Sequence, residues 1–166
     1  MGRSFGLALI LLILPLLSFS EEIILYAIVK GRVERVFVKE GEKVRNGDIL
    51  LKISAELYDA KIRELEARLK KLEVDRWKKE RDYKRYKEMF ERDLLAESIL
   101  EEKEAELRRV EYQIQEVKAQ IESLKILKKY TEIRSPVNGR VKRILVREGV
   151  HINGELIPQK VIVLQP

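Results

Sequence analysis

Residues 29–44 read VKGRVERVFVKEGEKV, and residues 137–152 read VNGRVKRILVREGVHI. Several residues recur at equivalent positions, among them Gly31, Arg32, Val33, Arg35, Val38, Glu40 and Gly41, which match Gly139, Arg140, Val141, Arg143, Val146, Glu148 and Gly149. So many matches in two short stretches indicate an internal duplication. The sequence therefore predicts a fold built from two copies of one unit, with the chain between them looping out.

Each copy carries the pattern of short β-strands. In the first copy, the β-branched residues Val33, Val36 and Val38 lie between turns that contain glycine. Apolar runs at residues 49–53 and 161–164 end the two copies. Because neither copy alone can bury its apolar face, we expect the two to pack together around a pseudo-twofold axis.

The chain between the copies has the periodicity of two helices. Heptads with a 4-3 spacing run from Tyr58 to Phe90 and again from Leu100 to Leu124. Sustained heptads flanked by charged residues are typical of a coiled coil. Two comparable runs joined by a short turn predict an antiparallel hairpin rather than two separate helices.

The first heptad series has a polar interruption. Arg76 and Lys79 stand at two of its positions, which predicts a looser layer near Val74 and Trp77. The first helix, at about residues 55–91, would be ~55 Å long at a rise of ~1.5 Å per residue. The second helix is expected to return to about residue 128.

Local signals predict where the helices begin and end. Ser54 is placed to cap the first helix, and Ser98 starts a capping-box pattern with Glu101, so the second helix should begin at Ser98. The tip of the hairpin then lies at about residues 91–98. Pro136 prevents helical continuation where the chain enters the second copy.

The first twenty residues read MGRSFGLALILLILPLLSFS. A positive start at Arg3, an apolar run and a plausible cut before Glu21 are the layout of a secretory signal peptide. The alternative is an uncleaved anchor in the inner membrane, although Pro15 interrupts the run and the run is shorter than the ~20 residues of a typical span. We expect the chain to be exported to the periplasm.

Composition argues against several functional classes. The chain has no Cys and a single His, His151, so thiol chemistry is excluded and a metal site is not expected. Its 34 Lys and Arg and 28 Asp and Glu are finely mixed along the helices, which favours a solvated helix over a nucleic-acid surface. No catalytic motif and no shielded pair of titratable groups is recognisable. We therefore predict a protein that is not an enzyme, holds no cofactor and binds no nucleic acid.

The whole arrangement resembles the HlyD-type membrane fusion, or periplasmic adaptor, family. The matching residues are GRVERVFVKEGEKVRNGDILLKI at 31–53 and TEIRSPVNGRVKRILVREG at 131–149, and SPVNG is similar to that family's Ala-Pro-x-Asp-Gly turn. The resemblance implies an α+β fold. A split lipoyl-like (barrel-sandwich hybrid) β-domain, formed by residues 21–54 and 131–166, would carry an inserted antiparallel coiled-coil α-hairpin at residues 55–130.

The same resemblance implies a function. Relatives bridge an inner-membrane transporter of the RND, ABC or MFS class to an outer-membrane channel of the TolC type, and several copies line up side by side, so we expect a homo-oligomer. The family's tip pattern has an Arg, a Leu four residues on and a Ser seven residues after that. Arg85 fits the first position, Met89 stands in place of the Leu, and Ala96 stands in place of the Ser. The residues expected to bind the partner are Arg85, Met89, Arg92, Asp93, Leu94, Leu95, Ala96 and Ser98.

Two other functions remain open at this point. Biotinyl and lipoyl carrier domains share the β half-motifs, but they carry a modified Lys where residues 53–56, Ile-Ser-Ala-Glu, have none. A periplasmic coiled-coil regulator or scaffold, for example of a cell-wall enzyme, is the second alternative. The resemblance also implies a β-barrel and a membrane-proximal domain after residue 166, so we expect a short adaptor, one half of a split system or a degenerate copy.

Overall fold

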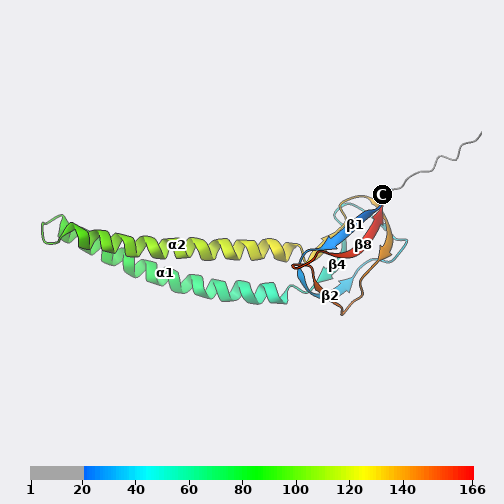
Figure 1. Cartoon of the computed structure of the whole chain (residues 1–166), viewed down its shortest axis with the longest axis horizontal. Coiled ribbons are helices and arrows are strands. Elements are labelled where there is room, and N and C mark those ends of the chain that lie inside the picture. Colours follow the sequence, from blue (N-terminus) through cyan, green and yellow to red (C-terminus); the bar gives the residue numbers. More distant parts are fainter. Residues whose placement is uncertain (1–20) are drawn as a thin grey trace, which may run out of the picture.

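The computed structural model describes residues 21–166, and the predicted signal peptide lies outside the described residues. An elongated pair of helices projects from one end of a small β-domain (Figure 1). The elements are β1 (Ile23–Ala27), β2 (Lys30–Val36), β3 (Lys43–Val44), β4 (Ile49–Ile53), α1 (Glu56–Phe90), α2 (Glu97–Lys129), β5 (Glu132–Arg134), β6 (Gly139–Ile144), β7 (His151–Asn153) and β8 (Gln159–Gln165). Neither helix of the described chain is long and apolar enough to cross a membrane.

The β-domain consists of two antiparallel four-stranded sheets. The strand order is β1-β8-β6-β3 in one sheet and β5-β4-β2-β7 in the other. In each sheet, the two central strands come from one half of the sequence and the two edge strands come from the other half. The strands before α1 and those after α2 are therefore interleaved, and neither half forms a sheet of its own.

The predicted duplication is visible in this pairing. Exchanging β1 with β5, β2 with β6, β3 with β7 and β4 with β8 converts every strand pair into another observed pair. The repeated glutamates have equivalent roles, since Glu148 Oε1 accepts the Val36 N–H and Glu40 Oε1 accepts the Ile144 N–H, both at 2.9 Å. Gly41 and Gly149 both have φ = +84°, a left-handed conformation that glycine adopts at little cost.

The core of the β-domain lies between the two sheets. Apolar residues of both halves are fully buried there, among them Val33, Leu50, Val141, Ile152 and Leu164. The first residues of β2 and β6 alternate between the core and solvent, as in a sheet with one buried face. The alternation shifts after Val33 and after Val141, where the strand register is irregular. Tyr58, in the first turns of α1, belongs to this core and is only 3% exposed.

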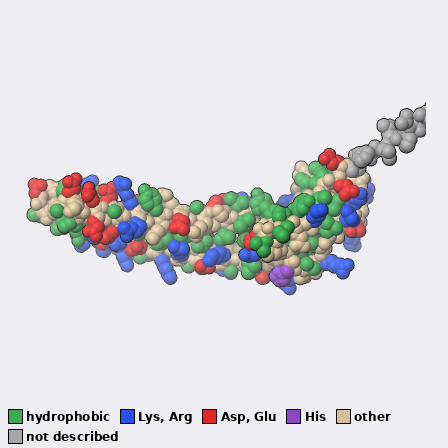
Figure 2. Space-filling view, viewed as in Figure 1, with side chains coloured by type: hydrophobic (Ala, Val, Ile, Leu, Met, Phe, Trp, Pro, Cys, Tyr) green, Lys and Arg blue, Asp and Glu red, His purple; other side chains and the backbone are tan. Residues whose placement is uncertain are grey.

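The two helices pack along their length. A second apolar cluster contains Ile62, Leu65, Val117 and Ile121, which lie at positions of the predicted heptads. The helix surface outside this seam carries closely mixed acidic and basic side chains (Figure 2). The helix pair is therefore held by a narrow apolar seam that begins at the β-domain.

The expected looser layer lies farther along the helix pair. Val74 and Trp77 are 55% and 57% exposed, on the outer side of α1. At the same part of the seam, Glu106 of α2 bonds to the ammonium groups of Lys79 at 2.7 Å and Lys103 at 2.9 Å. A polar cluster thus replaces apolar contacts at Lys79, one of the two polar positions that interrupt the predicted heptads.

Neither predicted serine occupies the N-cap position. α1 follows Ala55, and Ser54 lies one residue earlier: its N–H donates to the Arg32 carbonyl at 2.8 Å, and its Oγ accepts the Glu56 N–H at a long 3.5 Å. α2 begins at Glu97, one residue before Ser98, because the preceding Ala96 takes the extended conformation that starts the helix. Acidic residues occupy both first turns, where a negative charge is favourable.

Candidate partner-binding site

The candidate site is the free end of the helix pair, residues 85–99, which we call the tip (Figure 1). It is built around the turn after α1. The Asp93 N–H donates to the Phe90 carbonyl at 2.9 Å, and the Leu94 N–H donates to the Met89 carbonyl at 3.0 Å. These two bonds form the Schellman pattern, which satisfies carbonyl groups left free at a helix end. The tip therefore has a defined backbone rather than an irregular loop.

Asp93 has an unusual backbone conformation. Its φ of +58° is the only positive φ of a non-glycine residue among residues 21–166. The Schellman pattern requires the left-handed conformation at this residue, and Asp tolerates it better than most residues other than Gly and Asn. Asp93 is thus a structural residue of the turn, whereas the sequence singled it out as a partner-binding residue.

The turn presents Leu94 to solvent. Leu94 is 66% exposed, and Met89 is 37% exposed. Leu95, by contrast, is half-buried, so one of the two adjacent leucines closes the end of the helix pair and the other projects from it. The remaining predicted residues are all exposed: Arg85, Arg92, Asp93, Ala96 and Ser98.

Arg85 lies one helical turn before Met89 on the same face of α1. Its guanidinium is 3.6 Å from Asp82 Oδ1 and lies over the Tyr86 ring, 5.5 Å from the centroid. The side chain remains 63% exposed. These contacts hold the guanidinium against α1 while leaving most of it accessible to a partner.

Sequence reasoning missed Ile99 as a tip residue. It lies in the first turn of α2 and is 38% exposed, which is close to the value for Met89. The sequence did contain a signal for an exposed position, because Ile99 is an apolar residue outside the 4-3 spacing, immediately before the heptad residue Leu100. The tip thus carries three exposed apolar side chains, Met89, Leu94 and Ile99, among charged ones.

This arrangement suits non-covalent recognition. The tip is convex, and its exposed groups are apolar side chains flanked by Arg85, Arg92 and acidic residues (Figure 2). Among residues 21–166, no group of three or more His, Cys, Asp or Glu side chains is placed to hold a metal ion. A knob of this kind can enter a complementary groove of another protein, with apolar contacts at its centre and charged contacts around them.

Comparison with known proteins identifies the family. The family model described as RND MFP, barrel-sandwich hybrid domain, matches residues 22–164. The chain belongs to this family. Membership of the membrane fusion proteins (MFPs) confirms the resemblance read from the duplicated motif and the α+β barrel-sandwich hybrid fold. Because MFPs are adaptors, it also confirms the prediction that the chain is not an enzyme.

Individual relatives of this MFP are distant. The multidrug resistance protein MdtA of Yersinia pestis is 25% identical over 137 residues, which cover 82% of this chain and 31% of MdtA. The chain therefore spans about a third of the length of the curated relatives that it matches.

Solved structures show the same fold at low sequence identity. The periplasmic adaptor protein EmrA is 17% identical with a TM-score of 0.64, and the match covers 88% of this chain and 72% of EmrA. ZneB from Cupriavidus metallidurans is 18% identical with a TM-score of 0.63, over 87% of this chain and 60% of the solved chain.

Proposed function

We propose that this MFP is a periplasmic adaptor subunit of a tripartite efflux or secretion system. Residues 55–130 act as an inserted coiled-coil hairpin, and residues 21–54 and 131–166 act as the two halves of its lipoyl-like base. The tip binds an outer-membrane channel of the TolC type, and the base associates with an inner-membrane transporter of the RND, ABC or MFS class. Several copies act together as a homo-oligomer.

The observation that carries this proposal is the exposed Leu94 at the end of a long, rigid arm. α1 has 35 residues, so the arm is ~52 Å long at ~1.5 Å per residue. The Schellman turn fixes the direction in which Leu94 projects. An arm that offers an ordered apolar knob far from its base is suited to reaching a partner held at a distance.

The names of the relatives support the same function. MdtA is described as a multidrug resistance protein, and EmrA as a periplasmic adaptor protein. The barrel-sandwich hybrid family model matches residues 22–164 of this chain. Localisation in the periplasm, after cleavage before Glu21 or with residues 1–20 retained as an inner-membrane anchor, is part of the proposal.

Photo-crosslinking in living cells tests the proposal. The photoreactive residue is placed at Arg92, which is exposed and lies in the tip, because a bulky residue at Asp93 would disturb the left-handed turn. The matched control is Lys78, an exposed cation in the middle of α1. We expect the Arg92 probe, and not the Lys78 probe, to capture an outer-membrane channel protein.

The identity of the captured protein decides between the functions. Capture of a cell-wall enzyme at Arg92 would overturn the adaptor proposal and favour a periplasmic regulator or scaffold. Capture of the same proteins at Arg92 and Lys78 would show that the tip has no special role in binding.

A further inference from the structure

A row of polar side chains crosses three strands of the β-domain. Lys43 of β3 is the register partner of Arg140 of β6, and Arg140 is also the register partner of Gln165 of β8. Residues directly opposite each other in an antiparallel sheet project from the same face. The next residue along each strand is buried in the core, namely Val44, Val141 and Leu164. We call Lys43, Arg140 and Gln165 the cationic row, and it lies on the outer face of its sheet.

The cationic row places two positive charges side by side. Like charges directly opposite each other on neighbouring strands are destabilising. Within residues 21–166, no carboxylate forms an ion pair with either Lys43 or Arg140. The Arg140 guanidinium instead donates to the Gly41 carbonyl, which orients it. The positive charges of Lys43 and Arg140 are therefore not neutralised within the described chain, and the row can bind an anion.

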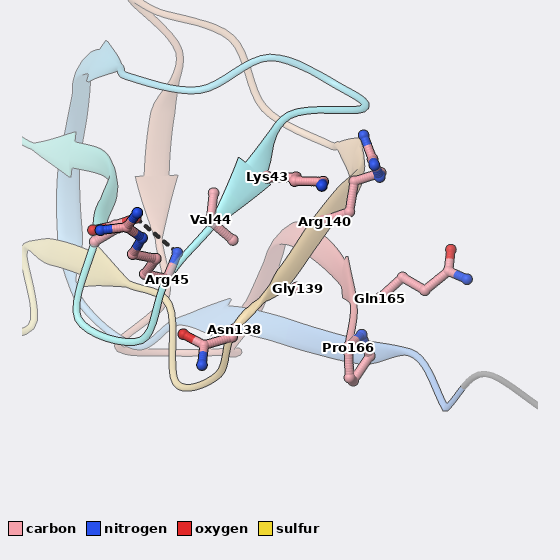
Figure 3. A pocket seen from close by; sticks show the side chains of 9 residues that line it. Lys43, Val44, Arg45, Asn138, Gly139, Arg140, Gln165 and Pro166 are labelled. Atoms are coloured by element: carbon pink, nitrogen blue, oxygen red, sulfur yellow. Dashed lines mark hydrogen bonds between the residues drawn. The ribbon is translucent and has the colours of Figure 1, made fainter.

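The row borders an open hollow of about 800 Å³, which is also lined by Arg45, Asp48 and Asn138. Figure 3 shows Lys43, Arg140 and Gln165 directed to one side of this hollow and Arg45 directed to the other. The acidic groups nearby have partners of their own. Asp48 Oδ2 accepts the Arg45 N–H at 2.7 Å, and Glu22 forms an ion pair with Lys142.

The charge of the whole chain is concentrated in the same domain. Residues 21–55 and 131–166 together contain 13 Lys and Arg against 9 Asp and Glu, whereas residues 56–130 contain 20 against 19. The positive excess therefore belongs to the β-domain, and Figure 2 shows basic side chains at its end beside the grey segment. An anionic partner would be drawn to this end rather than to the helix pair.

The chain also enters the β-domain at this end. Ile23 of β1 is the register partner of Leu164, the residue before Gln165. The apolar run at residues 5–17 is joined to β1 by only a few residues. A bilayer that holds this run would thus bring its headgroups close to the cationic row.

We propose that the cationic row binds the phosphate of an anionic lipid headgroup. The Lys43 ammonium and the Arg140 guanidinium supply charge-assisted hydrogen bonds to phosphate oxygens, and the Gln165 amide donates a further one. The contact sets the base of the adaptor against the membrane surface. It goes beyond the proposed function, because it involves neither the tip nor a channel.

The absence of cysteine allows a site-specific test. The full-length chain is labelled with a fluorophore at P166C, beside the row, or at L94C, in the tip. Each labelled protein is reconstituted into phosphatidylcholine vesicles, with or without phosphatidylglycerol, that carry a quencher on some headgroups. We expect phosphatidylglycerol to increase quenching of the label at residue 166 and to leave the label at residue 94 unchanged.

Substitutions test whether the cationic row causes the phosphatidylglycerol-dependent quenching. K43Q/R140Q should abolish the phosphatidylglycerol-dependent quenching, and R140K, which keeps the charge but not the planar fork, should retain part of it. K70Q/K78Q is the matched control, since it removes two exposed cations from α1 and should have no effect. Far-ultraviolet circular dichroism verifies that each variant is folded.

The outcomes separate phosphate recognition from simple charge attraction. Inorganic phosphate should reduce the quenching more than chloride at the same ionic strength. Equal effects of the two salts, equal quenching in both kinds of vesicle, or quenching that survives K43Q/R140Q would each overturn the proposal. Crosslinking at Arg92 reports separately on channel binding, so failure of one proposal leaves the other intact.

Discussion

The Tyr58 hydroxyl donates a 2.7 Å hydrogen bond to Glu155 Oε1, across 97 residues of sequence. The Tyr58 hydroxyl oxygen also accepts the Lys30 N–H at 3.0 Å, and the Lys30 ammonium lies 3.1 Å from Glu155 Oε2. Burial, followed by the hydrogen bond to Glu155, raises the pKa of Tyr58 to about 12. One side chain of α1 thus ties the helix pair to both halves of the β-domain.

Removal of the Tyr58 hydroxyl should weaken this junction. Y58F keeps the buried ring but removes the hydroxyl that bonds the Lys30 N–H and Glu155 Oε1, while the Lys30 ammonium still pairs with Glu155. A hydrogen bond contributes about 0.5–1.5 kcal/mol net, so loss of the two should lower the free energy of unfolding in urea by about 1–3 kcal/mol. Y112F is the control, because Tyr112 is 64% exposed, and an equal loss in both variants would contradict this role of the hydroxyl.

Acid should selectively weaken the polar cluster of the helix pair. Hydrogen bonds from Lys79 and then Lys103 lower the pKa of Glu106 from 4.5 to about 2. A carboxyl with a lowered folded-state pKa stabilises the fold above its unfolded pKa, and this contribution disappears as pH falls from about 4.5 to about 2. The melting temperature of the wild type should therefore exceed that of E106Q at neutral pH and converge on it near pH 2.

The control for this titration is E101Q, because Glu101 is exposed and forms no ion pair among residues 21–166. Its melting temperature should follow that of the wild type at every pH. A difference between wild type and E106Q that persists unchanged at pH 2 would show that Glu106 acts through packing and not through its charge.

The tip residues should matter for transport and not for folding. We expect L94D to abolish export by the assembled system, because it puts a charge on the most exposed apolar side chain of the tip, and R85D to do the same by reversing the neighbouring charge. Helicity and melting temperature should remain unchanged in both. V74D is the matched control for L94D, since Val74 is also a largely exposed apolar residue of the helix pair. Normal export by L94D, at normal protein levels, would remove Leu94 from the site.

The left-handed Asp93 makes the turn sensitive to side-chain shape. D93G should be tolerated, because glycine adopts a positive φ without a steric cost. D93V should destabilise the chain by about 1–2 kcal/mol, the cost of the left-handed conformation for a residue with a β-carbon. Urea unfolding of the two variants measures the difference, and similar values would mean that the turn rearranges on substitution.

The sequence predicted the features that depend on local pattern. The duplication followed from repeated residues such as Gly41 and Gly149, which recur because both turns need the same left-handed backbone. The two helices followed from the 4-3 spacing, and the break in their apolar seam from Lys79. These features could be predicted because helical periodicity and turn conformation depend on residues that are close together in the sequence.

Features that depend on backbone angles or strand register were not predicted. The start of α2 was placed at Ser98 because a capping box is a residue pattern, whereas the extended conformation of Ala96 decided it. Asp93 was assigned to partner binding, and its role in the turn became visible only with its φ. The cationic row joins Lys43, Arg140 and Gln165, which only the pairing of β3, β6 and β8 brings together.

The interleaving of the strands sets an order for folding. β8 is the last strand of the sequence and a central strand of its sheet, so that sheet cannot close until the whole chain is available. The helix pair contains no strand of either sheet, so it can form earlier. Its closure brings the Ile53 N–H to the Thr131 carbonyl, 2.8 Å apart, and so aligns the two halves before they meet. Neither sheet of such a chain can be completed until the strands that follow α2 are available.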